Sequence, residues 1–151
     1  MTPFSIVGPI TPRLDSVLTY WQELRRGEAE MPFWDDIDLK AVRGLCREIL
    51  LLDVPGGPER FRLAIAELSI EPADRDRILG RFIDEVELPP PLDLLRSQCS
   101  ATVETARPTV YRHAPCAGSE SAYSRLLLPA WGEGQVRMLL GAVEHGRRDD
   151  D

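Results

Sequence analysis

Residues 48–65 decide the fold, and they read Glu48-Ile-Leu-Leu-Leu-Asp-Val-Pro-Gly-Gly-Pro-Glu-Arg-Phe-Arg-Leu-Ala-Ile65. The segment 48–54 contains four successive apolar residues, is too short for a free helix and ends at a Pro-Gly-Gly-Pro turn. Such a run predicts a strand that is buried on both faces and is therefore central in its sheet. After the turn, Phe61, Leu63 and Ile65 alternate with arginine or alanine, which predicts a half-buried strand and, with the first, a hairpin.

Three more strands are predicted toward the C-terminus, over residues 109–113, 122–130 and 135–145, the last two joined by the glycine-containing turn Gly132-Glu-Gly134. Between the two groups of strands, residues 66–90 favour short helical pieces, and Leu92–Ala106 favours a longer helix that follows Pro89-Pro90-Pro91. Two leading and three trailing strands with helices between them predict an α+β fold, with one antiparallel sheet covered on one face by helices.

An amphipathic helix precedes these strands. Its apolar residues recur at helical spacing and form one stripe: Leu14, Val17, Leu18, Trp21 and Leu24. Gly27 ends this helix, and a second helix capped by Asp36 or Asp38 follows, running to about Cys46. We therefore expect a flexible arm over residues 1–12, one domain over 13–145 and a polar tail over 146–151.

Composition argues against several classes of partner. The chain has 151 residues and a formal net charge of −7, with a pI near 4.9. An acidic chain is not expected to bind nucleic acid or an anionic membrane, because phosphate binding relies on clustered positive charge. No stretch approaches the roughly 18 apolar residues of a membrane span, and the N-terminus lacks a basic signal-peptide region. Three widely spaced cysteines favour a reducing cytoplasm over structural disulfides.

The residues that could carry chemistry are sparse. His113-Ala-Pro-Cys116 and the distant His145 make a weak metal pattern, because a metal site needs three or four ligands in fixed geometry. A nucleophilic Cys116 activated by His113 lacks an orienting third group. We therefore expect neither a metal site nor catalysis.

A ligand pocket between the longer helix and the sheet is the functional alternative to a filled core. The apolar residues expected to line this space are Leu63, Ile65, Leu92, Leu95, Cys99, Val103 and Leu140. Gln98 and Tyr111 are the polar residues expected to reach it.

Several phrases, taken in order, resemble the PAS domain family, and within it the small stand-alone PAS-like proteins of alphaproteobacteria. The helix Val17–Gly27 is similar to the family's opening "YW..LR.G", Asp36-Ile-Asp38 to "DIDP", and Ile49–Phe61 to its first hairpin. Farther along, the matching phrases are Gly80-Arg-Phe82, Val103–Val110, Leu126–Pro129 and Leu139–Ala142. The resemblance implies a five-stranded antiparallel sheet in the order 2-1-5-4-3. The sequence departs from the pattern at Ala66-Glu67, Pro72 and Ala106.

The resemblance also bears on cofactors. PAS relatives that bind haem place a histidine on the longer helix, and residues 92–106 contain none. Relatives with flavin photochemistry place a cysteine in Asn-Cys-Arg-Phe, whereas Cys99 lies in Gln-Cys-Ser. The expectation is therefore a protein without haem, flavin or metal.

The leading hypothesis is a non-enzymatic cytoplasmic PAS-type sensor that binds a small molecule and signals through another protein or a second copy of itself. The alternative is a ligand-free interaction adaptor, and a small enzyme on an α+β scaffold is a third hypothesis. The N-terminal helix lies outside the five-strand core that the resemblance implies, so its stripe must cover either the open face of its own sheet or the same face of a second copy. We favour a homodimer interface with Leu18 and Trp21 near the centre.

The first prediction tests the central strand. Replacing Leu51 with Asp places a charge inside the sheet layers and is expected to unfold the domain. Thermal unfolding followed by circular dichroism checks this. A Leu51→Asp variant that melts cooperatively near the wild-type midpoint would contradict the strand assignment.

Overall fold

A five-stranded antiparallel sheet in the order β2-β1-β5-β4-β3 organises the chain in the computed structural model. The structure describes residues 4–6, 8–55, 60–113 and 122–146. The strands are β1 (Glu48–Asp53), β2 (Arg62–Glu67), β3 (Thr109–His113), β4 (Tyr123–Gly132) and β5 (Gln135–His145). This order confirms the predicted α+β class, and β1 is an inner strand that pairs with both β2 and β5.

The helices begin where the sequence supplies start signals. They are α1 (Pro12–Glu23), η1 (Trp34–Asp36), α2 (Leu39–Leu45), α3 (Pro72–Ile78), η2 (Ile83–Glu85) and α4 (Leu95–Thr105). Prolines open α1 and α3, and the Asp38 carboxylate caps α2 by accepting a hydrogen bond from the Lys40 amide. The longest of the predicted central helices begins at Leu95, later than expected, because Leu94 has a left-handed φ of 58° that helical residues do not adopt.

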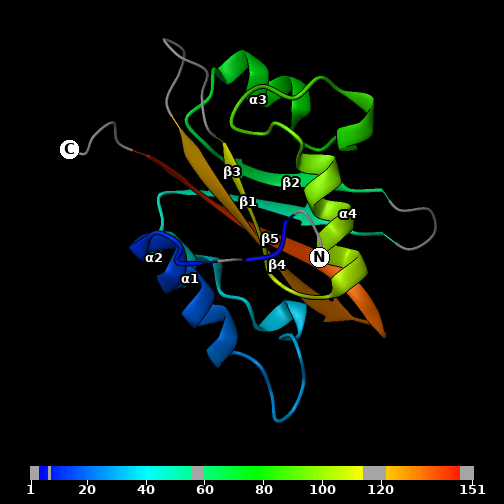
Figure 1. Cartoon of the computed structure of the whole chain (residues 1–151). Coiled ribbons are helices and arrows are strands. Elements are labelled where there is room, and N and C mark those ends of the chain that lie inside the picture. The colour runs from blue at the N-terminus through cyan, green and yellow to red at the C-terminus, as the bar shows by residue number, and fades with distance from the viewer. Residues whose placement is uncertain (1–3, 7, 56–59, 114–121, 147–151) are drawn as a thin grey trace.

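Helices cover both faces of the sheet: the central helices cover one face, as predicted, and the N-terminal helices cover the other. In Figure 1, α1 and α2 lie on one side of the sheet, and α3 and α4 lie on the other. Each side has its own cluster of buried apolar residues. The physical reason is the continuous apolar character of the inner strands, whose two faces both need to be covered.

The first helix is part of this intramolecular packing. Leu14 and Val17 are fully buried, and Trp21, with 2% of its surface exposed, donates a 2.8 Å hydrogen bond from Nε1 to the carbonyl of Pro129 in β4. Leu18 and Leu24 are only half-buried at the margin. The predicted dimer surface on this stripe is therefore wrong, because most of it covers the chain's own sheet.

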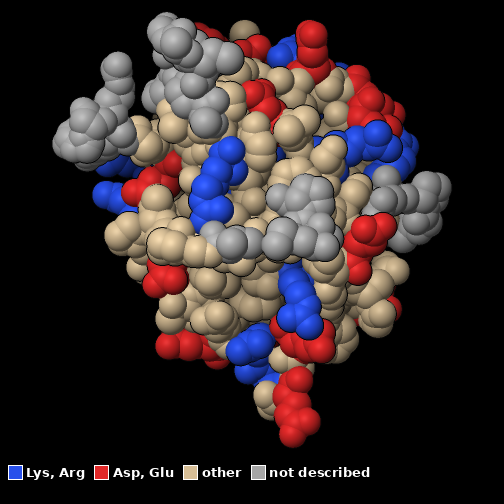
Figure 2. Space-filling model, viewed as in Figure 1, with Lys and Arg blue, Asp and Glu red and all other residues tan. Residues whose placement is uncertain are grey.

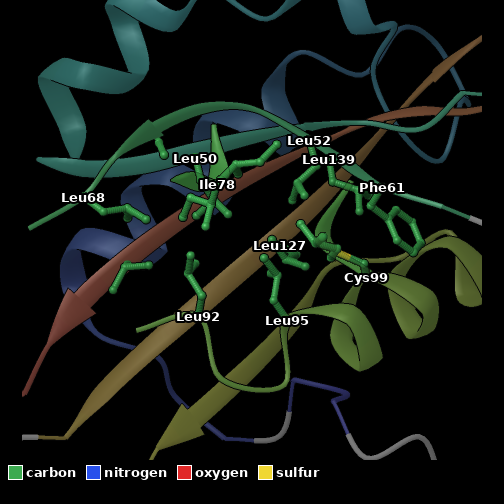
Figure 3. Packing of buried hydrophobic residues seen from close by; sticks show 14 of the residues in the cluster. Leu50, Leu52, Phe61, Leu68, Ile78, Leu92, Leu95, Cys99, Leu127 and Leu139 are labelled. Carbon is green, nitrogen blue, oxygen red and sulfur yellow. The ribbon is translucent and has the colours of Figure 1, made fainter. Parts of the chain in front are cut away.

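The opposite face carries the larger core. Leu50, Leu52, Leu127 and Leu139 from the strands point toward Leu95 and Cys99 of α4 (Figure 3). Gly141 in β5 makes room for this packing, since a Cβ at that position would lie 2.6 Å from Leu50 Cδ2 and 3.0 Å from Leu127 Cδ2.

An irregularity in β2 changes which side chains share a face. Leu52 pairs with Leu63, and Leu51, the residue before it in β1, pairs with Ile65. Ala64 therefore has no partner in β1 and is an extra residue in β2. A bulge of this kind reverses the alternation beyond it. The expectation that Leu63 and Ile65 line the same space is therefore wrong.

Both sheet edges are partly covered by other segments. Next to β3, Ser5 bridges to Thr109, the Val110 amide donates to the Phe4 carbonyl at 2.9 Å, and Arg112 donates to the Pro9 carbonyl at 2.9 Å. The described part of the arm expected over residues 1–12 therefore lies along β3. Next to β2, residues 80–83 hydrogen-bond to Phe61 and Leu63.

Within the described residues, no helix is long and apolar enough to cross a membrane.

The second prediction separates intramolecular packing of α1 from a dimer interface. Trp21→Glu is expected to lower the free energy of unfolding by about 3–5 kcal/mol, because it removes a buried indole and places a charge against the sheet. Urea denaturation measures the change. Gln22→Glu on the exposed side of α1 is the control and should stay within about 0.5 kcal/mol of the wild type. A stable Trp21→Glu protein that changes only its oligomeric state by light scattering would contradict the packing described here.

Candidate functional site

A buried arginine joins α4 to the sheet. Arg125 in β4 is fully buried, and its Nε donates to Oε1 of Gln98 in α4 at 2.8 Å. The Gln98 amide nitrogen donates in turn to Thr109 Oγ1 of β3 at 3.0 Å and to the Arg125 carbonyl at 3.1 Å. Thr102, one turn along α4, lies 2.7 Å from the same Thr109 hydroxyl. These four residues form a buried polar cluster, which we call the arginine clamp.

The clamp also fixes the segment that leads into α4. Arg125 Nη1 donates to the Pro91 carbonyl at 2.8 Å, and Nη2 donates to the Asp93 carbonyl at 2.7 Å. The planar guanidinium therefore reaches three acceptors on the 91–98 segment at once. A flexible lysine ammonium does not supply donors in this fixed arrangement.

The electrostatics of the clamp are unusual for a buried cation. Among the described residues, no carboxylate forms an ion pair with Arg125; its charge is met by the three oxygen acceptors and by the Tyr111 ring, whose centroid lies 4.9 Å from the guanidinium carbon. Burial lowers the pKa of Arg125 from its ordinary value, although an arginine stays charged at neutral pH. Burial also raises the pKa of the neighbouring Tyr123 to about 12, so its phenol remains neutral.

The residues predicted to line a pocket divide between the two faces. Leu63, Leu95 and Cys99 lie in the core under α4, while Val103 and Tyr111 pack half-buried against it. The side chain of Gln98 belongs to the arginine clamp, where it hydrogen-bonds to Thr109 and Arg125. Leu140 lies in the cluster under α1, because Leu139, its neighbour in β5, already points toward α4. Ile65 is likewise absent from the α4 side, as the bulge at Ala64 requires.

An open groove runs along the outer edge of β2, below α3. It has a volume of about 570 Å³ and is lined by Arg47, Glu48, Arg75, Leu79 and the consecutive residues 64–69. Arg75 of α3 donates to the carbonyls of Ala66 and Leu68 at 3.0 and 2.6 Å. The side chain therefore occupies part of the strand edge that residues 80–83 leave open.

A smaller hollow of about 330 Å³ adjoins this groove and shares Arg47 and Glu48 with it. In it, His145 Nε2 lies 3.0 Å from Glu48 Oε2, and the other Glu48 oxygen accepts the Ser69 amide at 3.0 Å. Cys46, which also lines the hollow, is 2% exposed, and burial raises the pKa of its thiol. A buried, protonated thiol is a poor nucleophile, so the arrangement does not form a catalytic centre.

The other predicted chemical residues do not converge. His113 stacks on Tyr123 with ring centroids 4.9 Å apart, and its predicted companion Cys116 lies outside the described residues. No group of three or more metal-ligating side chains is found in the part of the chain that the structure describes. In the view of Figure 2, basic and acidic side chains are interspersed, and no continuous basic stripe crosses that face.

Comparison with known proteins gives structural likenesses only. No family model matches the chain, and no curated protein matches it. One similar solved structure is described as "Flavin Analogue Sheds Light on Light-Oxygen-Voltage Domain Mechanism"; it has a TM-score of 0.49 and 18% identity over 74% of this chain and 85% of that one. Another is described as "Structure of an RNA-binding Light-Oxygen-Voltage Receptor", with a TM-score of 0.37 and 24% identity over 69% of this chain and 31% of that one.

One of these likenesses corrects an expectation about cofactors. The expectation of a protein without any cofactor is contradicted, since one similar structure belongs to a domain studied with a flavin analogue. The expectation that nucleic acid is not a partner rests on the net charge of the chain.

The described side chains between α4 and the sheet leave no room for a flavin. Leu95 and Cys99 of α4 are fully buried and pack directly on strand residues such as Leu127 and Leu139 (Figure 3). A flavin ring system does not fit between these side chains as they lie.

Sequence reasoning identified Gln98 but missed its partners. Arg125 directly precedes the apolar run Leu126-Leu-Leu128 inside a predicted strand, and a lone arginine beside such a run is a signal for a buried and hydrogen-bonded cation. Thr102 and Thr109 carried no comparable signal, because threonine is ordinary in helices and strands alike.

The third prediction concerns the clamp. Arg125→Met is expected to reduce the free energy of unfolding by about 2–4 kcal/mol, because the Gln98, Pro91 and Asp93 oxygens lose their donors in a buried site. Arg125→Lys should recover only part of this loss. Urea denaturation measures both variants, and Arg96→Gln on the exposed side of α4 is the control. An Arg125→Met protein as stable as the wild type would show that the clamp contributes nothing to α4 docking.

Proposed function

We propose that this chain is a PAS-type sensor or signalling domain without catalytic chemistry of its own, which acts in the cytoplasm through contact with another protein. The observation that carries this proposal is the attachment of α4 to a sheet of order 2-1-5-4-3 through the arginine clamp. The ordered sequence phrases similar to PAS domains support the same class.

The arginine clamp supports the proposed signalling role because its hydrogen bonds form or break together. Apolar packing tolerates small shifts, whereas a guanidinium with three directed acceptors is satisfied in one arrangement only. A change that removed one acceptor would leave buried polar groups unpaired and would favour a second position of the 91–98 segment. A sensor needs a discrete change of this kind.

A second candidate is the interaction adaptor. It is favoured by the close packing of Leu95, Cys99, Leu127 and Leu139, which fill the space where a sensor of this class would hold a small molecule. In the adaptor, α4 is a fixed structural element, and only the outer surface is used.

The fourth prediction distinguishes the two. If the chain acts as a ligand-binding sensor, native mass spectrometry of the freshly purified full chain shows a retained small molecule. Its removal is expected to increase hydrogen exchange in residues 91–105 and to leave β1 protected, because the clamp holds the former and the sheet core the latter. A bare polypeptide mass would contradict the sensor and support the adaptor. A retained molecule whose removal changes nothing in residues 91–105 would contradict signalling through the clamp.

A further inference from the structure

The groove along β2 is rich in unused donors and poor in unused acceptors. Arg43 engages both carboxylate oxygens of Glu67 at 2.7–3.0 Å, and its hydrogen bonds lower the pKa of that carboxyl. Glu48 is engaged by the Ser69 amide and His145. The carbonyls of Ala66 and Leu68 are engaged by Arg75. Both carboxylates that line the groove, and the carbonyls of Ala66 and Leu68, are therefore already paired.

Two guanidinium groups facing the groove are not paired in the same way. Arg47 is exposed and has no hydrogen bond or ion pair with any described residue. Arg75 uses Nε and Nη2 on the strand edge, and its Nη1 has no acceptor among the described residues. Free donors of this geometry match a carboxylate, which accepts hydrogen bonds from a guanidinium at two oxygens.

The groove also offers an apolar contact. Of the described large apolar residues, only Leu79 and Leu94 are exposed, and Leu79, at 40%, lies in this groove beside Ile65. A ligand with both carboxylates and apolar side chains would use both kinds of lining, whereas a bare inorganic anion would use only the arginines.

The shape of the groove favours an extended chain. Its floor includes residues 64–67 of β2, and strand residues advance about 3.3 Å each, so this part of the floor is about 10 Å long. The groove is open to solvent along its length, which suits a segment that enters from another protein.

We propose that this groove binds an extended acidic segment of a protein partner, with its carboxylates on Arg47 and Arg75 and an apolar side chain against Leu79. The proposal rests on the proposed function, since it names the surface through which a domain of this class contacts its partner.

The experiment is fluorescence anisotropy with the full chain and a short labelled peptide in which glutamate alternates with valine. The matched peptide with glutamine in place of glutamate is expected to bind at least tenfold more weakly. Arg47→Gln is expected to weaken binding of the acidic peptide about tenfold, in line with the loss of a charge-assisted hydrogen bond. Leu79→Ser is expected to weaken it severalfold.

Arg96→Gln is the matched control, because Arg96 is an exposed arginine of α4 that does not line the groove. No saturable binding of the acidic peptide, or equal losses in Arg47→Gln and Arg96→Gln, would overturn the proposal. Citrate that competes as tightly as the peptide binds would indicate a site for free anions and would also overturn it.

These results are distinguishable from a failure of the proposed function. Peptide binding by a protein that retains no small molecule would support the groove as a binding site and contradict the sensor function. A retained small molecule without peptide binding would support the sensor function and contradict the groove as a binding site.

Discussion

The guanidinium of Arg125 is the constraint on which the arrangement of the α4 side depends. A charge in this position is costly to bury, and here it is satisfied by oxygens of Gln98, Pro91 and Asp93 and by the face of Tyr111. All of these groups have to be in place together. The position of α4, the path of residues 91–94 and the contact of α4 with β3 therefore follow from one side chain.

The helices on the two faces of the sheet are held by different kinds of contact. Under α1 the contacts are apolar, apart from the indole hydrogen bond of Trp21 to the Pro129 carbonyl. Under α4 the apolar core is joined by the arginine clamp. Apolar packing is non-directional and stabilises both sides, whereas directed hydrogen bonds also give α4 a defined position on its side of the sheet.

The edges of the sheet also differ. The β3 edge is covered by backbone contacts with residues 4 and 5, whereas the β2 edge is covered in part by residues 80–83 and in part by a single side chain, Arg75. An edge covered by a side chain leaves space beside it, and the groove occupies that space. The groove that we propose for a partner thus lies at the outer edge of β2, away from the stripe of α1 that was predicted as a dimer surface.

Local sequence patterns predicted the strands, their approximate ends and the α+β class, because apolar runs and alternation are local signals. The strand order was predicted only through the resemblance to PAS domains. The periodicity also placed Gln98 on the longer helix, with its side chain expected to reach the space between that helix and the sheet. Only the tertiary structure decided that α1 covers its own sheet, that Ile65 and Leu140 face away from α4, and that Arg125 is buried. The face of the sheet on which Ile65 lies depends on a bulge between paired strands. The burial of Arg125 depends on hydrogen-bond acceptors about 30 residues away in sequence, at Gln98, Pro91 and Asp93. Contacts of that kind exist only after the chain has folded, so no local pattern records them.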